Sequence, residues 1–315
     1  MSTIKAGNSA TTTLLRTPDT SGNLTFLADS QLVTCSTTGA LNIPSGTTAQ
    51  RPATGVTGML RYNTSISKLE VYIDSGWSNV NTSIYTYTIT GLAVAGGAGA
   101  GYGNNAGGGG GGGFVTITRT SVLPGSTYTI TVGGGGSGSG VGTVGAGTNG
   151  SNSVLAADTA LGGGTGSNDS TLNGSNGGSG GGSGYNGTSY GSGGSATQGN
   201  TTNGIGYGFA GASGSASGGG GGAGGAGSGN TGGAGRASSI TGSSVTYAAG
   251  ASANAGAGGA NTGNGGSAQY NGGSGVVILS MPTENYSGTT TGSPTVTTSG
   301  GNTILKYTSS GSYTT

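Results

Sequence analysis

The feature that most constrains this chain is a run of seven consecutive glycines, Gly107 to Gly113, set in a long region of glycine, serine, alanine and asparagine. Glycine supplies 80 of the 315 residues. Each glycine inside a helix costs roughly 1 kcal/mol relative to alanine, so a conventional helical core is excluded. Any order in this region therefore has to come from contacts between backbones.

Two interpretations fit the glycine-rich region: disorder and a bundle of polyproline II helices. Low complexity of this kind usually means disorder. However, only 5% of the residues are charged, whereas disordered chains usually carry net charge, and short apolar segments interrupt the glycines. Collagen is excluded, because there are only 6 prolines and no Gly-X-Y period.

We therefore expect residues 95–275 to form packed polyproline II segments. A polyproline II helix has three residues per turn and no internal hydrogen bonds, so its N–H and C=O groups must find partners on neighbouring segments. Glycine lets those neighbours approach closely enough, as it does at the axis of collagen. The expected fold is all-β with an irregular glycine-rich polyproline II helix bundle and essentially no α-helix.

Short apolar segments predict β-strands between the glycine-rich segments. They lie at residues 84–90, 92–94, 114–118, 127–132, 153–155, 239–247 and 276–279. If these strands form one end of the domain, each glycine-rich excursion leaves a sheet and returns to it, so its turning point lies far from the strands. We place the turning points near residues 102–105, within 185–209 and near 261–271.

Residues 46–83 have the pattern of a small β-meander. A unit with one tryptophan and few large aliphatic side chains buries little on its own. We expect its Met59, Tyr72 and Trp77 to need a partner surface, and hence the meander to be trimeric. The predicted strands and the turn lie at residues 58–63, 68–73, 74–76 and 77–80.

The pattern divides the chain into four segments. Short β-like pieces occur at residues 23–27 and 31–35, and a tail hairpin is predicted from residues 293–298 and 302–307. We expect this hairpin to pair with the main sheet or with a neighbouring chain. The segments are an N-terminal attachment segment at 1–45, the meander at 46–83, the glycine-rich domain at 84–281 and the C-terminal β-hairpin at 282–315.

The side chains that catalysis needs are missing. There is no histidine, which removes the usual general base and the commonest metal ligand. The single cysteine, Cys35, cannot form a zinc site or an intramolecular disulfide. Glu70 and Asp74 are close in sequence, but we interpret them as surface charges. We expect no enzymatic activity, no cofactor and no bound metal.

Composition also limits the partners. The 8 lysines and arginines are scattered, and the net charge is +1, so no basic patch is available for nucleic acid. No apolar run approaches the ~20 residues of a membrane span. Residues 1–5 lack the apolar stretch of a signal peptide. We expect no binding of nucleic acid, no membrane insertion, and synthesis in a cytoplasm without export by that route.

The meander resembles a module that recurs in phage tail fibres. The opening of the chain, through residues 19–24, looks like the start of the same kind of fibre protein. The resemblance implies a place in the virion, attachment to other tail or capsid proteins through the N-terminal segment, and a homotrimer. The matching segments are residues 46–52 (GTTAQRP), 58–64 (GMLRYNT), 69–72 (LEVY) and 76–77 (GW).

The glycine-rich domain resembles those of phage adhesins. That resemblance implies a sandwich of polyproline II helices with receptor-binding loops at its tip. The ligand it implies is a host surface glycan or an outer-membrane protein. The matching segments are residues 92–97, 128–133, 239–242, 245–247 and 272–278.

Tyrosine is the informative residue for binding, with 14 copies against three phenylalanines and one tryptophan. Tyrosine among serine, glycine and asparagine is the chemistry of antibody loops, where it supplies rigid amphipathic contact area. For any single tyrosine, packing beside the glycines is the alternative role. The predicted receptor contacts are Tyr102, Asn104, Asn105, Tyr185, Asn186, Tyr190, Tyr207, Phe209 and Tyr270.

The leading hypothesis is a phage virion fibre or adhesin that binds a receptor on the bacterial surface. One alternative is a purely structural virion component, such as a head fibre or a tail spacer, whose tip loops bind nothing. A second alternative is an extracellular matrix or silk-like protein. The missing signal peptide and the fibre-like first 80 residues argue against this last possibility.

Overall fold

The computed structural model describes residues 43–80, 86–140, 142 and 145–315 of the chain. The chain divides into two compact units, one within residues 1–83 and one comprising residues 84–315. The fold is all-β, as predicted. In the described part of the chain, helical structure is limited to two short 3₁₀ segments, η1 (Thr48–Gln50) and η2 (Thr283–Asn285).

The first unit is a four-stranded sheet in the order β1-β2-β3-β4, with β1 parallel to β2 and the other pairs antiparallel. The last three strands are those of the predicted meander. Asp74 and Ser75 both have positive φ (46° and 72°), as a two-residue type I′ hairpin between β3 and β4 requires. The β-like pieces predicted at residues 23–27 and 31–35 lie outside the described residues. The strands are β1 (Ser45–Gly46), β2 (Leu60–Asn63), β3 (Lys68–Ile73) and β4 (Gly76–Asn79).

The buried face of this sheet is polar. Along β2, Arg61 and Asn63 are buried. Leu60 and Tyr62, which alternate with them, are exposed. Because successive side chains of a strand point to opposite faces, the usual arrangement of apolar inside and polar outside is reversed here.

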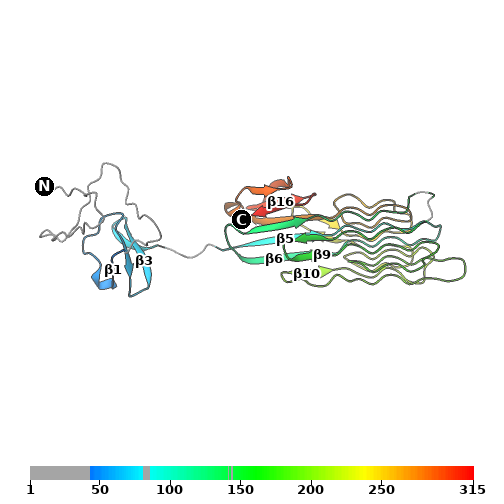
Figure 1. Ribbon diagram of the computed structural model, residues 1–315, viewed down its shortest axis with the longest axis horizontal. Coiled ribbons are helices and arrows are strands. Elements are labelled where there is room, and N and C mark those ends of the chain that lie inside the picture. The colour runs from blue at the N-terminus through cyan, green and yellow to red at the C-terminus, as the bar shows by residue number, and fades with distance from the viewer. Residues whose placement is uncertain (1–42, 81–85, 141, 143–144) are drawn as a thin grey trace, which may run out of the picture. The chain divides into compact units, whose positions relative to one another are not determined.

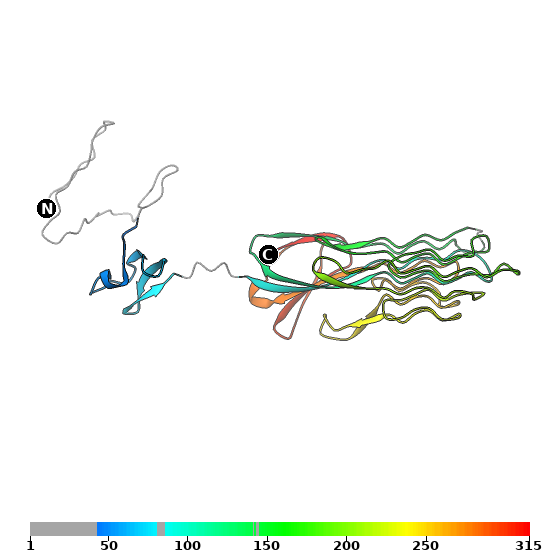
Figure 2. The same cartoon turned by 90° about the horizontal axis from the view of Figure 1, so that it is seen from below.

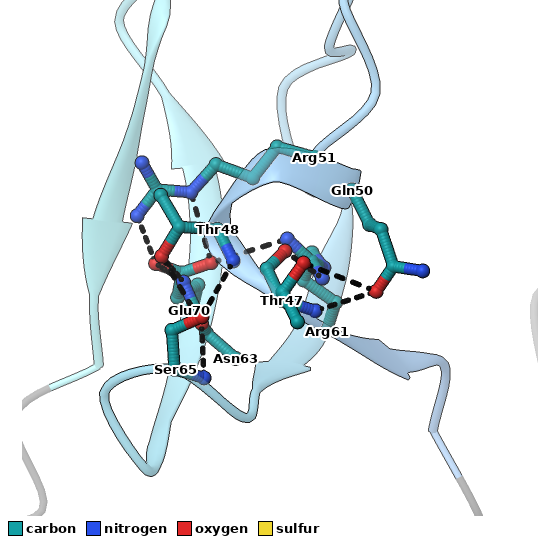
Figure 3. Close-up of polar contacts among 8 residues, drawn as sticks. All are labelled: Thr47, Thr48, Gln50, Arg51, Arg61, Asn63, Ser65 and Glu70. Atoms are coloured by element: carbon teal, nitrogen blue, oxygen red, sulfur yellow. Dashed lines mark hydrogen bonds and ion pairs between the residues drawn. The ribbon is translucent and has the colours of Figure 1, made fainter.

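Glu70 of β3, interpreted from the sequence as a surface charge, instead lies at the centre of this polar interior (Figure 3), where its side chain is inaccessible to solvent. Its carboxylate accepts hydrogen bonds from Arg51, with Nε 3.2 Å from Oε2, and from Asn63 Nδ2 at 2.9 Å. Arg61 adds a second positive charge, with Nη1 3.6 Å from Oε2. The Arg61 guanidinium also lies 5.7 Å from the ring centre of Trp77, so the only tryptophan reports on this network.

We predict that the first unit loses stability in acid through Glu70. The hydrogen bond from Arg51 lowers the pKa of this carboxyl below its ordinary value of 4.5, although burial opposes the shift. Because the pKa of Glu70 is lower in the folded than in the unfolded state, its ionised carboxylate stabilises the folded unit fully above pH 4.5. That contribution to stability is lost as the pH falls toward the folded-state pKa. Denaturation of the full chain followed by Trp77 fluorescence should therefore give a midpoint that is constant from pH 7 to pH 5 and then falls.

Glu70→Gln should lower that midpoint at pH 7 and flatten its decline in acid. Asp74→Asn, which removes an exposed carboxylate from the neighbouring turn, is the matched control and should keep the decline. An unchanged acid profile in Glu70→Gln would contradict the assignment.

The second unit contains two main sheets and a small hairpin (Figure 1). The six-stranded sheet runs β10-β6-β5-β13-β16-β15, formed by β5 (Tyr87–Val94), β6 (Phe114–Val122), β10 (Gly204–Tyr207), β13 (Val276–Pro282), β15 (Thr295–Ser299) and β16 (Asn302–Tyr307). The five-stranded sheet runs β14-β17-β7-β8-β9, formed by β7 (Thr127–Thr131), β8 (Ser153–Leu155), β9 (Asp158–Ala160), β14 (Thr289–Thr291) and β17 (Gly311–Thr314). The hairpin consists of β11 (Arg236–Ser238) and β12 (Val245–Tyr247).

The main apolar core lies between the two sheets, where Leu279 of β13 and Leu155 of β8 belong to one buried cluster. A second cluster covers the other face of the six-stranded sheet. There, Val276 and Ile278 of β13 share the cluster with Tyr247 of β12. Since β13 is buried on both faces, its sequence is a continuous apolar run rather than an alternating one.

The tail contributes to both main sheets. β15 and β16 form the predicted tail hairpin, turning at Gly300 and Gly301, which both have positive φ. β16 pairs with β13, and β17 pairs with β7. Six of the described strands, β1, β9, β10, β11, β14 and β17, were not predicted, because their short sequences lack an apolar run. Residues 239–244, predicted as strand, instead connect β11 to β12.

The glycine-rich segments run side by side away from the sheets (Figures 1 and 2), and their hydrogen bonds repeat every three residues. In the segment Gly107 to Gly113, the Gly108 N–H donates to Gly218 O at 2.8 Å. Three residues later, the Gly111 N–H donates to Gly221 O at 2.9 Å. Three residues per turn is the period of polyproline II. Successive amides of this segment donate in turn to carbonyl groups of three neighbouring segments, at residues 218–221, 263–266 and 161–164.

The carbonyl groups of the segment Gly107 to Gly113 accept hydrogen bonds from three other neighbouring segments. Ala98 N–H donates to Gly110 O at 2.9 Å, and Ser179 N–H donates to Gly111 O at 3.2 Å. The glycine run is therefore the central helix of the bundle, surrounded on all sides by backbone. The segments that donate to its carbonyls lie at residues 95–98, 179–182 and 251.

This packing explains the glycine run. A Cβ placed on Gly110 would collide with the carbonyl oxygen of Ser179, and one on Gly111 with that of Ala248. Every residue from Gly107 to Gly112 would meet a neighbouring backbone carbonyl in this way. Only glycine allows the segments to approach to hydrogen-bonding distance on all sides.

We predict that Gly110→Ala destabilises the second unit by about 2 kcal/mol or more, because rigid backbone cannot yield to the added methyl group. Gly134→Ala is the matched control, since its Cβ would have nothing within 4 Å. The control should be neutral or stabilising by up to about 1 kcal/mol through the unfolded state. Denaturant unfolding followed by near-ultraviolet circular dichroism of the tyrosines measures both.

Amide hydrogen exchange provides an independent check. The amides of residues 108–113 should exchange far more slowly than those of an unfolded peptide of the same sequence. Equal exchange rates would show that the segment is disordered.

Candidate functional site

The glycine-rich segments reverse direction in a set of turns at the end of the bundle far from the sheets (Figures 1 and 2). We call these the distal turns. They bring together residues that are far apart in sequence. The distal turns comprise residues 102–106, 168–171, 185–190, 213–217, 228–231, 253–256 and 267–270.

Hydrogen bonds connect the distal turns to one another. Asp169 N–H donates to Tyr102 O at 3.3 Å, and Ala253 N–H donates to Asn230 O at 3.0 Å. Ser217 Oγ lies 3.5 Å from Asn104 O, to which it donates. The turns therefore form one connected surface rather than independent loops.

The turn at residues 185–190 is closed by side chains as well as by backbone. Asn186 Oδ1 accepts hydrogen bonds from Thr188 N–H at 3.1 Å and from Ser189 N–H at 2.9 Å. Gly187 supplies the positive φ of 93° that this tight turn requires. The rings of Tyr185 and Tyr190 stack, with centres 4.5 Å apart and planes inclined by 24°. Tyr190 is nevertheless 58% exposed.

A hollow of about 430 Å³ opens between the neighbouring turns. Its lining combines carboxamides, hydroxyls and one tyrosine, and none of the lining side chains is charged. Tyr270 is 46% exposed. The polar lining residues are Asn104, Ser217, Asn230, Asn254, Ser267, Gln269 and Tyr270.

The structure brings most of the predicted contact residues to the distal turns. Asn104 and Tyr270 line the hollow. Tyr102 and Asn105 belong to the same turn as Asn104, and both are half-buried. Tyr185, Asn186 and Tyr190 form the turn with the stacked rings.

Tyr207 and Phe209 lie elsewhere. Tyr207 ends β10, which is an edge strand of the six-stranded sheet, and it pairs there with Phe114 of β6. The Arg236 guanidinium lies 3.5 Å from the centre of the Tyr207 ring. A turning point far from the strands was predicted within residues 185–209, but the chain returns to the sheet there to form β10, and this places both aromatic residues away from the turns.

Sequence reasoning missed five polar residues of the hollow: Ser217, Asn230, Asn254, Ser267 and Gln269. Asn230 and Asn254 lie in tracts of glycine, serine and alanine where no turning point was predicted, whereas Gln269 lies within the turning point predicted near residues 261–271. A signal was present at Gln269, which is next to Tyr270 and is the only glutamine in that tract.

The chemistry of this surface is hydrogen bonding and aromatic contact. Asp169 is the charged residue of the distal turns. Among the residues that the structure describes, no three histidine, cysteine, aspartate or glutamate side chains come together as a metal site would require. No helix within the same residues is long and apolar enough to cross a membrane.

We predict that Asn186→Ala loosens the turn at residues 185–190 without disturbing the bundle. The amides of Thr188 and Ser189 would lose their acceptor and should exchange at least about tenfold faster, which corresponds to one lost hydrogen bond. The tyrosine circular dichroism signal should also fall as the stacked pair separates. Exchange at residues 108–113 is the internal control and should not change; protection at 188 and 189 that persists in the variant would contradict the prediction.

Comparison with known proteins gives a family but no characterised relative. No curated protein and no solved structure matches the chain significantly. The family model described as a glycine-rich domain matches residues 73–282, which is more than half of the chain. That span begins at the end of β3 and ends with β13. The chain therefore belongs to the family of glycine-rich domain proteins.

Proposed function

We propose that this chain is a phage virion fibre or adhesin protein that binds a receptor on the host bacterial surface through its distal turns. The observation that carries the proposal is the position of these turns. They form a nearly uncharged surface of tyrosine, asparagine and serine at the end of the bundle opposite its sheets. Tyrosine with small polar residues is the composition of binding loops in antibodies.

The bundle suits a recognition surface for a physical reason. Its central segment has backbone partners on all sides, so the turns start from fixed positions. A surface that is ordered before binding loses less conformational entropy when it binds, which favours affinity. The side chains of the turns can also vary without changing the scaffold, because loops tolerate substitution better than packed segments.

The first unit fits a role in assembly. We propose that the N-terminal segment attaches the protein to other tail or capsid proteins and that the chain is a homotrimer on the virion. The apolar side chains on the outer face of the meander support this. Leu60 is 42% exposed and Tyr62 39% exposed, and other large apolar residues of the unit are exposed as well: Val56, Met59, Ile66 and Ile73.

We predict that Tyr185→Ala combined with Tyr190→Ala reduces adsorption of particles to host cells at least about tenfold, because exposed aromatic residues are frequent hot spots of binding. The variant particles should assemble normally. Val296→Ala, which truncates an exposed side chain of the edge strand β15, is the control and should adsorb as the parent does. If particles whose distal turns are all replaced still adsorb normally, the chain is a structural component of the virion.

We predict that the full chain sediments as a trimer at micromolar concentration and that Leu60→Lys combined with Tyr62→Lys converts it to a folded monomer. The two lysines would place charge on the apolar face while leaving the buried Glu70 network intact. Ile205→Lys, at a position 54% exposed in the second unit, should leave the trimer unchanged. A folded monomer of the unsubstituted chain would refute the assignment.

A further inference from the structure

Carboxamide side chains within the bundle accept hydrogen bonds from backbone amides. Asn264 Oδ1 accepts a hydrogen bond from Ala249 N–H at 2.9 Å, and Asn176 Oδ1 accepts one from Ser195 N–H at 2.7 Å. In each case the carboxamide satisfies an amide that no neighbouring carbonyl reaches. The same role is taken by Asn149, Asn152, Asn173, Gln198, Asn200 and Asn271.

The carboxamides that line the hollow are different. Within the part of the chain that the structure describes, the side chains of Asn104, Asn230, Asn254 and Gln269 make no hydrogen bond to the protein. They come from four separate turns, yet they surround one space. Each offers two N–H donors and one carbonyl acceptor. The hollow therefore presents several unused donors and acceptors together.

The backbone of Gln269 is held in an unusual conformation. Its φ of +72° lies in the left-handed region, which residues other than glycine and asparagine rarely adopt. Two neighbouring segments fix it there, since its N–H donates to Gly101 O at 3.0 Å and its O accepts from Gly140 N–H at 3.3 Å. Residues held in this way often occur at ligand sites.

The electrostatic surroundings favour a neutral ligand. None of the side chains that line the hollow is charged. The nearby Asp169 carboxylate packs against the backbone of Gly103, which itself lines the hollow. No lining side chain supplies a cation that could balance the charge of a negatively charged ligand. The exposed ring of Tyr270 supplies an apolar face of the kind on which the C–H face of a sugar ring can lie.

We propose that the hollow binds an uncharged saccharide unit, with the four carboxamides bonding its hydroxyl groups and Tyr270 contacting its ring. A hydroxyl group both donates and accepts, as a carboxamide does, so the two pair in either direction. The volume of about 430 Å³ is within the usual range for small-ligand sites. This inference rests on the proposed function, because it names the class of receptor group that the distal turns would recognise.

The test measures binding of the full chain to an array of immobilised oligosaccharides. The array carries neutral sugars built from glucose, galactose, mannose and N-acetylglucosamine, beside sulfated and uronic acid sugars of the same size. We expect binding to at least one neutral sugar and at least tenfold weaker binding to its acidic counterpart. Asn254→Ala combined with Gln269→Ala, and separately Tyr270→Ala, should weaken the neutral interaction at least tenfold.

Asn302→Ala is the matched control, since it removes a carboxamide from β16 at the other end of the unit, and it should bind as the parent does. Near-ultraviolet circular dichroism confirms that each variant is folded. Three results would overturn the inference: no neutral sugar bound, acidic sugars bound as well or better, or unchanged binding in the Asn254 and Gln269 variant.

The two proposals fail in different ways. If the Tyr185 and Tyr190 variant loses adsorption but no neutral sugar binds, the receptor function stands, the saccharide inference fails, and a protein receptor is indicated. If a neutral sugar binds through Asn254 and Gln269 but particles adsorb normally with all distal turns replaced, the saccharide site stands and the receptor function fails.

Discussion

Hydrogen bonds between neighbouring backbones hold the second unit together over most of its length, and they depend on how closely two segments can approach. A segment with three residues per turn directs its amides to three sides and receives bonds from three others, as Gly107 to Gly113 does. A side chain on any of these faces would separate the segment from a neighbour and leave an N–H or C=O without a partner, which is costly away from water. The two sheets at one end supply what the bundle lacks, an apolar core that fixes where each segment begins and ends.

The first unit is held together by polar side chains in its interior. It has few apolar residues, and those on β2 lie on the outside, while charged and polar groups fill the inside around Glu70. An ion pair in such a position is demanding, because each buried charge must be matched by partners with good geometry. Both units therefore rely on polar interactions that specify one arrangement, around Glu70 in the first unit and along the glycine-rich bundle in the second, where an apolar core between the sheets is also present.

Much of this fold could be predicted from the sequence, and the reason lies in particular segments. Alternating or continuous apolar runs such as Phe114–Thr118 and Val276–Leu279 marked the main strands, and the uncharged glycine run indicated a polyproline II bundle. β10 could not be found, because Gly204-Ile205-Gly206-Tyr207 looks like the rest of its tract and becomes a strand only by pairing with β6. That omission misplaced Tyr207 and Phe209. The hollow was equally hidden, since Asn230 and Asn254 resemble the asparagines that bond the backbone until the turns are placed in space.

The backbone-bonded interior has a thermodynamic consequence. The heat capacity change of unfolding rises by about 0.45 cal/K/mol for each Å² of apolar surface that becomes exposed. It falls by about 0.26 cal/K/mol for each Å² of exposed polar surface. Unfolding the bundle exposes mainly peptide groups, so its heat capacity change per residue should lie below that of an ordinary domain. A small heat capacity change makes the curve of unfolding free energy against temperature shallow. The free energy of unfolding of the bundle would therefore vary little over a wide range of temperatures. A scanning calorimeter would record this as an unfolding enthalpy that varies little with the transition temperature.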